Sequence, residues 1–236
     1  MKTIFKKIYI HPLTYLIILI SLITGLIKPI ITLLFIIIIH ELGHILSSML
    51  FKWKIDRIVI LPFGGITIFN ELINRPLYQE FIILVSGPLF QFINYLIFNN
   101  INNYFNSINY GLFLFNFLPI YPLDGYKFWV ILFSTYLPYK IVLYLMVFIS
   151  ILFIIKNFKL NFIIILVLFF LLVGLIKHIK EIKYIYLKFL LERNNHKFKF
   201  KKTKHINNIN HFYKDKYHII NNIKEEDYLK NKFNLF

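Results

Sequence analysis

His40, Glu41 and His44 are the residues best suited to chemistry, and they form an H-E-x-x-H motif. On a helix, positions i and i+4 share one face, so both imidazoles can reach the same metal ion. Bound zinc lowers the pKa of its water toward about 7, and a neighbouring carboxylate can take the proton of that water. The motif therefore predicts a helix that binds zinc through two histidines and uses Glu41 as general base.

The setting of the motif argues against a chance match, which is the alternative interpretation. The motif lies between two apolar runs, residues 33–39 and 45–51. A charged side chain inside a membrane span costs about 2.5–3.5 kcal/mol on insertion scales, so ionisable residues there are a functional hypothesis by default. Of the eight histidines, only His40 and His44 lie in a strongly apolar segment.

A second polar interruption, residues 116–125, offers a third ligand in Asp124. Two histidines and one carboxylate, with water in the fourth position, form a catalytic zinc site. Pro119 and Pro122 break the helix just before Asp124, and freed backbone groups at membrane depth are tolerated only in buried or watery surroundings. An ordinary turn at a helix end, with Asp124-Gly125 as turn residues, is the alternative. We predict one zinc ion, held by the two motif histidines and Asp124.

Composition places the chain in a lipid bilayer. Its 236 residues are 58% hydrophobic with a mean hydropathy of +0.65, and the apolar residues come in long runs. The chain has no cysteine, so histidines and carboxylates must bind any zinc. We predict an all-α polytopic membrane protein with about six transmembrane helices, at residues 13–27, 30–51, 81–98, 108–126, 136–155 and 160–177.

The distribution of basic residues predicts the orientation. If the basic N-terminus is cytoplasmic, the basic loop 52–80 and the basic tail also lie in the cytoplasm, as the positive-inside rule requires. His44 is eight residues from Lys52, and Asp124 is three residues from Lys127. We therefore expect both termini in the cytoplasm and the site toward the cytoplasmic side, where water can enter.

Two other function classes fit parts of the sequence. The net charge of +16 is compatible with a nucleic-acid partner, but most of the excess lysine flanks hydrophobic spans or lies after residue 177, so no nucleic acid is expected. A metal transporter is the alternative from a different class. Transport leaves Glu41 without a role, and no repeat symmetry is apparent between the halves.

Five short segments occur together in this chain: residues 40–44, 62–65 (PFGG), 74–76 (NRP), 86–88 (SGP) and 116–125. Together they resemble the site-2 protease family of intramembrane zinc metalloproteases, and most of all its stage IV sporulation branch, which processes pro-sigma-K. The resemblance covers residues 1–180. It implies a zinc metalloendopeptidase that cleaves a membrane-associated protein, in this branch a sigma-factor pro-sequence during sporulation. Action on anti-sigma factors or signal-peptide remnants, as in other site-2 proteases, is the alternative.

The same resemblance implies further site residues. Asn116 becomes a candidate donor to the oxyanion of the tetrahedral intermediate, although its amide could equally satisfy a carbonyl of the broken helix. Residues 58–69 become a short β-hairpin that dips into the membrane, with Phe63, Gly64 and Gly65 as substrate-binding residues and an edge that holds the substrate as an added strand. A plain cytoplasmic loop is the alternative for this segment.

The chain is predicted to have two parts, a membrane metalloprotease domain at residues 1–178 and a basic cytoplasmic region at 179–236. Members of the sporulation branch resemble a protease followed by a nucleotide-sensing module of the cystathionine-β-synthase type. The tail looks like a truncated module and is short for a full one, which argues against nucleotide sensing. Its histidines, from His178 to His218, are expected to face solvent. The resemblance also implies inhibitory membrane-protein partners, and a homo-oligomer is compatible with the sequence.

Overall fold

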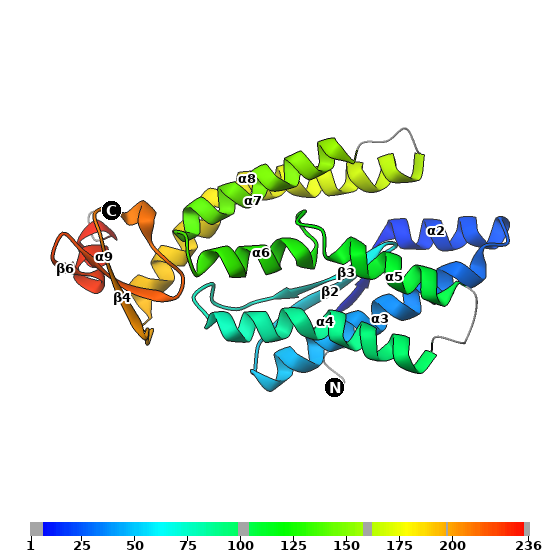
Figure 1. Cartoon of the computed structure of the whole chain (residues 1–236), viewed down its shortest axis with the longest axis horizontal. Coiled ribbons are helices and arrows are strands. Elements are labelled where there is room, and N and C mark those ends of the chain that lie inside the picture. The colour runs from blue at the N-terminus through cyan, green and yellow to red at the C-terminus, as the bar shows by residue number, and fades with distance from the viewer. Residues whose placement is uncertain (1–6, 99–103, 158–161, 197, 234–236) are drawn as a thin grey trace. The chain divides into compact units, whose positions relative to one another are not determined.

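The structure is a computed structural model that describes residues 7–98, 104–157, 162–196 and 198–233 (Figure 1). Its helices and strands fall into two units, which we describe separately. The first unit consists of Met1–Glu71 and Gln79–Leu118, and the second consists of Leu72–Tyr78 and Pro119–Phe236.

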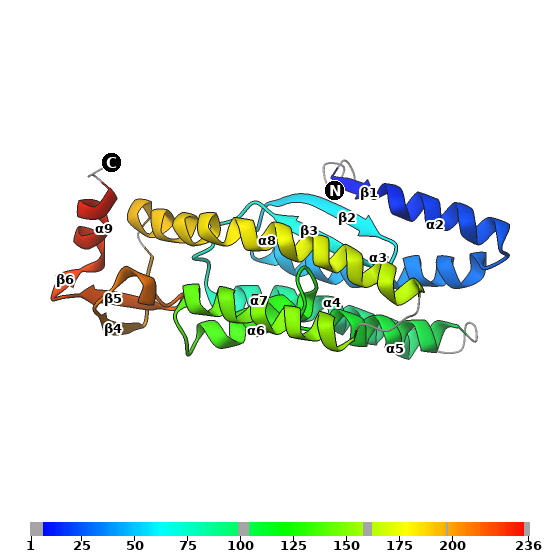
Figure 2. The same ribbon diagram turned by 90° about the horizontal axis from the view of Figure 1, so that it is seen from above.

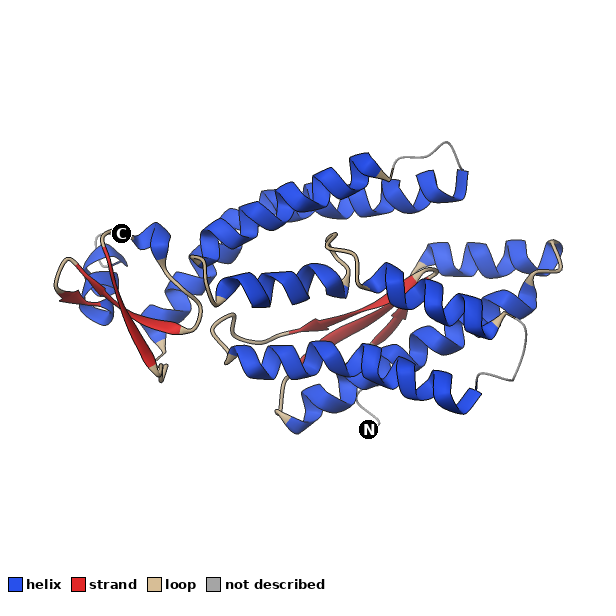
Figure 3. Cartoon of the chain, viewed as in Figure 1, coloured by secondary structure: helices blue, strands red, loops and turns tan. Residues whose placement is uncertain are grey.

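Helices dominate the first unit because its long apolar runs satisfy their backbone groups internally, as a bilayer requires. A small sheet accompanies them, and its strands β2 and β3 pack against helix α3 (Figure 3). The helices are α2 (Pro12–Ile23), α3 (Ile27–Leu50), α4 (Leu77–Phe98) and α5 (Phe105–Asn116), and the strands are β1 (Ile8–Ile10), β2 (Ile55–Leu61) and β3 (Gly64–Phe69).

The sheet of the first unit has the order β1-β2-β3, with β1 parallel and β3 antiparallel to β2. Leu61 pairs with Gly64, so two residues form the turn of the β2–β3 hairpin. Ile55 and Ile58 of β2 form a buried cluster with Ile45 of α3, which fixes the sheet on that helix. β2 is the only neighbour of β3 among the described strands, so β3 is an edge strand.

Three of the described helices are long and apolar enough to cross a membrane, namely α3, α4 and Tyr139–Lys156, which is α7. Helix α2 is apolar but shorter. Large apolar side chains such as Leu50, Ile97 and Ile155 are exposed on these helices, as expected where lipid is the solvent. The chain thus has the apolar helices of an integral membrane protein. The number of spans and the depth of the hairpin stay predictions.

The predicted span at residues 108–126 is not one continuous helix. Helix α5 ends at Asn116, and α6 (Asp124–Ser134) begins at Asp124. Pro119 and Pro122 lie between the two helices and cannot donate to a helical hydrogen-bond ladder. The prolines therefore produce the break that their positions predict, and Asp124 stands in the first turn of a new helix.

The second unit contains α6, α7 (Tyr139–Lys156) and the long helix α8 (Phe162–Asn195). Helices α7 and α8 lie side by side in both views (Figure 1, Figure 2). Residues 160 and 161 of the predicted span 160–177 lie outside the described residues, and its remainder belongs to α8. After α8 come the elements of the tail: β4 (Lys202–Ile206), η1 (Ile209–His211), β5 (Lys216–Ile220), β6 (Ile223–Lys224) and α9 (Glu225–Phe233).

The fold is mainly helical, as predicted, and each unit also contains a small three-stranded sheet. In the tail, β4 pairs in parallel with β5, and β5 pairs antiparallel with β6. These strands are only two to five residues long. Such short strands carry little periodicity of their own, and pairing stabilises them. The predicted boundary at residue 178 stays a prediction.

Arg193, near the end of α8, is the centre of the tail's packing. Its guanidinium donates to Glu225 at 2.9 Å, to the carbonyl of Tyr213 at 2.7 Å and to Asn74 Oδ1 at 2.7 Å. Burial lowers the pKa of Arg193, and the charge of Glu225 opposes that shift. A buried arginine with these partners links the tail strands to the loop that precedes α4.

Two histidines correct the expectation that the tail histidines face solvent. His178 is 5% exposed and His218 is fully buried. The ring of His218 accepts the backbone N–H of Tyr213 at Nε2, at 2.9 Å, and its Nδ1 lies 2.8 Å from Glu225 Oε2. Because Nε2 accepts, Nδ1 carries the hydrogen, and His218 is a neutral structural residue of the tail.

Candidate metal centre

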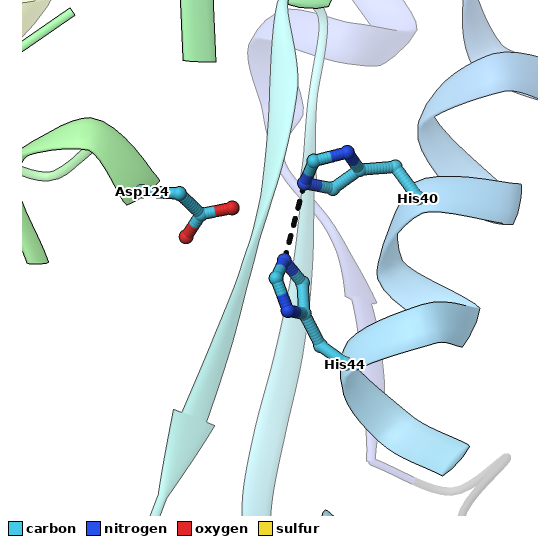
Figure 4. Close-up of side chains that lie close together, drawn as sticks. All are labelled: His40, His44 and Asp124. Atoms are coloured by element: carbon cyan, nitrogen blue, oxygen red, sulfur yellow. Dashed lines mark hydrogen bonds between the residues drawn. The ribbon is translucent and has the colours of Figure 1, made fainter. Parts of the chain in front are cut away.

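Helix α3 presents its two motif histidines as a pair. His40 and His44 are 2% and 5% exposed, and their Nε2 atoms are 3.1 Å apart. Two nitrogens that bind one tetrahedral ion at about 2.0–2.1 Å lie about 3.3–3.4 Å apart. The spacing i to i+4 therefore has the geometry of a two-histidine metal ligand, as the sequence predicts (Figure 4).

The hydrogen bonds behind the rings determine which nitrogen faces the site. His40 Nδ1 lies 3.0 Å from Gln91 Oε1, and His44 Nδ1 lies 2.8 Å from the carbonyl oxygen of Ile83. Both oxygens accept, so both Nδ1 atoms carry the hydrogen and both Nε2 atoms present a lone pair. Two such lone pairs 3.1 Å apart repel each other unless a cation lies between them. The donor set therefore fits a metal ion.

Gln91 is itself held in one orientation. Its Nε2 donates to the backbone oxygen of Asn109 at 2.9 Å and to Asn109 Oδ1 at 3.0 Å. That arrangement turns the Gln91 oxygen toward His40. Sequence reasoning did not single out Gln91 or Asn109, although an amide inside an apolar span is an available signal.

Glycines bring α4 close to the histidine pair. A Cβ at Gly87 would overlap the ring of His44 and stand 2.9 Å from His40 Nε2, and a Cβ at Gly43 would overlap the backbone oxygen of Ser86. The segment 86–88 alone predicts little, but the structure explains its glycine: any side chain at position 87 would collide with the histidine rings. Only a residue without a side chain fits at position 87.

Asp124 begins α6, where the negative charge of a carboxylate is favoured by the helix dipole. Its side chain is 15% exposed, and Lys127 donates to Oδ1 at 3.1 Å. The ligand atoms of His40, His44 and Asp124 all lie within 4.8 Å of one another, so the three residues are a group that could hold a metal ion (Figure 4).

Glu41 directly follows His40 on α3, and its side chain is held by the hairpin. It is 4% exposed, and Thr67 of β3 donates to its Oε2 at 2.5 Å. A Cβ at Gly65 would overlap the Glu41 carboxylate, so the strand backbone lies directly against it. Gly65, which the sequence predicts to bind substrate, thus lies against the candidate base Glu41. The sequence did not predict this contact.

Asn116 ends α5 close to the turn of the hairpin. A Cβ built at Gly64 would stand 3.8 Å from Asn116 Oδ1, and the rings of Phe63 and Phe115 are 6.4 Å apart, edge to face. The first unit therefore brings Asn116 together with Phe63 and Gly64. Its role toward an oxyanion stays a prediction.

Parts of this chain are similar to known peptidases. Residues 28–105 match the model of Peptidase family M50. Stage IV sporulation protein FB of Bacillus subtilis is 39% identical over 144 residues, which are 57% of this chain and 50% of that protein. A zinc metalloprotease of Methanocaldococcus jannaschii is 31% identical over 102 residues, 38% of this chain and 29% of that protein. The chain thus spans half or less of the length of these relatives.

A solved structure shares the fold. The site-2 protease from Methanocaldococcus jannaschii superposes with a TM-score of 0.58 at 23% identity, over 72% of this chain and 89% of that one. The segment that matches the family model includes the H-E-x-x-H motif, the hairpin and Gln91. Residues 28–105 of this chain are therefore similar to Peptidase family M50, and the chain shares the fold of that site-2 protease.

Proposed function

We propose that this chain is an intramembrane zinc metalloendopeptidase. The observation that carries the proposal is the histidine pair, whose Nδ1 hydrogens are bound by Gln91 and by the Ile83 carbonyl, so that the two Nε2 lone pairs lie 3.1 Å apart. His40, His44 and Asp124 would hold one zinc ion, which when bound supplies a Lewis acid and an acidic water.

Glu41 is the proposed general base. Its carboxylate takes a proton during attack on the scissile carbonyl and passes it to the leaving amine. Near-complete burial keeps bulk solvent from the carboxylate, and Thr67 holds one of its oxygens. Asn116 is the proposed donor to the oxyanion.

The proposed substrate is a membrane-associated protein that adds a strand to the free edge of β3, near Phe63, Gly64 and Gly65. A helical substrate must unwind before cleavage, and an edge strand offers hydrogen-bond partners to the unwound segment. We propose that the hairpin dips into the membrane, that both termini are cytoplasmic and that the site opens toward the cytoplasm.

We propose a sigma-factor pro-sequence cleaved in sporulation as the substrate. The identity with a stage IV sporulation protein supports this choice. Small membrane proteins that hold the enzyme inactive are the proposed partners. Anti-sigma factors or signal-peptide remnants are the second candidate class of substrate, supported by the match to M50 peptidases as a whole.

Co-expression of the full chain with a membrane-associated pro-protein tests the function. Native protein is compared with Glu41→Gln and Asp124→Asn for cleavage and for zinc bound per chain. We expect cleavage by the native protein alone, zinc retention in Glu41→Gln and zinc loss in Asp124→Asn. Equal cleavage by Glu41→Gln would contradict the mechanism, and metal uptake into vesicles without cleavage would favour a transporter.

A further inference from the structure

The hydrogen bond between Thr67 and Glu41 is short and buried. Thr67 Oγ1 lies 2.5 Å from Glu41 Oε2, and the two residues are 6% and 4% exposed. Hydroxyl donors approach ionised carboxylates to about 2.5–2.7 Å, closer than neutral acceptors. The distance thus lies at the short end of the range for hydroxyl–carboxylate hydrogen bonds, with Thr67 as donor and Glu41 Oε2 as acceptor.

Gly65 supports the carboxylate from the same side of the strand. Residues 65 and 67 are two apart, so they face the same side of β3. A Cβ at Gly65 would overlap Cγ, Cδ and Oε1 of Glu41, which means that bare backbone lies against the rest of the side chain. Glu41 is therefore confined by contact at Gly65 and anchored by hydrogen bonding at Thr67.

The strand that carries Thr67 is fixed independently of that hydrogen bond. Thr67 pairs across the ladder with Ile58 of β2, and Ile58 is buried with Ile45, one turn beyond Glu41 on α3. Packing thus sets the distance between β3 and α3. The Thr67 hydroxyl needs no further adjustment to reach Glu41.

We propose that Thr67 is a positioning residue for the general base, an inference that rests on the proposed function. By binding Oε2, Thr67 stops rotation of the carboxylate and leaves Oε1 to carry the proton. Because Thr67 belongs to the edge strand proposed to pair with substrate, one element holds both the base and the scissile segment. A misplacement of about 1 Å at a reacting group can cost about 100-fold in rate, so loss of this contact should lower kcat and leave KM unchanged.

The test uses the full chain reconstituted in vesicles, with kcat, KM, zinc per chain and melting temperature measured for each variant. Thr67→Val removes the hydroxyl and keeps the shape, and Thr67→Ser keeps the hydroxyl. Thr32→Val is the matched control, because Thr32 is another buried threonine of the first unit whose hydroxyl donates to the carbonyl of Lys28.

We expect Thr67→Val to bind zinc normally, with KM within about twofold and kcat lowered about 10- to 100-fold. Thr67→Ser should return kcat to within about threefold, and Thr32→Val should leave it unchanged. A kcat of Thr67→Val within twofold of native overturns the inference. An equal loss in Thr32→Val also overturns it, since any buried hydroxyl would then suffice.

If Thr67→Val does not fold, a second pair of variants tests the role of the Thr67 hydroxyl. Thr67→Ser and Thr67→Ala differ by one oxygen atom, so a kcat at least tenfold higher in the serine form supports the inference, and equal values overturn it. Glu41→Gln in the same assay distinguishes a failure of the proposed function from a failure of the role of Thr67. If Glu41→Gln cleaves as well as native protein, the proposed function fails; if it is inactive while Thr67→Val is normal, only the role of Thr67 fails.

Discussion

Gln91 Oε1 lies 3.0 Å from Nδ1 of His40 and accepts the hydrogen of that nitrogen. This hydrogen bond joins two residues that are 51 positions apart and fixes the tautomer of a proposed ligand. This contact and other contacts between buried residues lead to four predictions, in addition to the tests described above.

Gln91→Leu should weaken zinc binding about 10- to 100-fold, because His40 then loses the acceptor that keeps its Nε2 unprotonated. Competition with a chromophoric chelator measures the zinc Kd of the purified full chain. Asn94→Leu is the control, since Asn94 is a buried amide on the same helix and its side chain has no hydrogen-bond partner among the described residues. Equal weakening in both variants would refute a specific role for Gln91.

Gly87→Ala should abolish zinc binding and lower the melting temperature, because the new methyl group would overlap the His44 ring. Zinc per chain and thermal unfolding in detergent measure the two effects. Gly111→Ala serves as control, since nothing lies within 4 Å of a Cβ built there. In a helix, that change should be neutral or stabilising by up to about 1 kcal/mol. Normal zinc content in Gly87→Ala would show that α4 does not press against the pair.

Arg193→Met should destabilise the tail by about 3–5 kcal/mol, because it leaves the buried carboxylate of Glu225 without its guanidinium partner. Limited proteolysis after residue 195 reports this loosening. Lys188→Met is the comparison, since Lys188 is largely exposed and lies 3.8 Å from Glu192, where an ion pair contributes at most about 1 kcal/mol. Similar protease resistance in native protein and Arg193→Met would contradict the prediction.

Acid should loosen the tail before it unfolds the rest of the chain. Burial lowers the pKa of His218 below its usual 6.5, and the hydrogen bond to Glu225 only partly opposes this. Burial raises the pKa of Glu225, but the hydrogen bond from His218 and the charge of Arg193 outweigh it and leave the pKa below 4.5.

A group with a lowered folded-state pKa stabilises the fold above its unfolded pKa and loses that contribution as pH falls. We therefore expect stability of the tail to decline from about pH 6.5 downward through His218, and further below about pH 4.5 through Glu225. Hydrogen exchange of residues 202–220 between pH 7.5 and 5.5 measures the first step. His205→Gln, at an exposed position, should leave the profile unchanged, and pH-independent protection in the native chain would count against this account.

The sequence by itself determined the local part of this protein. The i to i+4 spacing of His40 and His44 places both rings on one face of any helix, and the prolines before Asp124 end the preceding helix whatever surrounds them. Long apolar runs likewise predict apolar helices without reference to their neighbours. Short-range geometry carries all of this information.

Tertiary structure decided what surrounds those residues. Gln91 reaches His40, Thr67 reaches Glu41 and Arg193 reaches Asn74 across 51, 26 and 119 positions, and no periodicity encodes such pairs. The buried state of His218 and the short strands of the tail depend in the same way on partners far along the chain or on pairing. Packing chooses which side chains meet, because hydrogen bonds form only between groups that the folded backbone brings within reach.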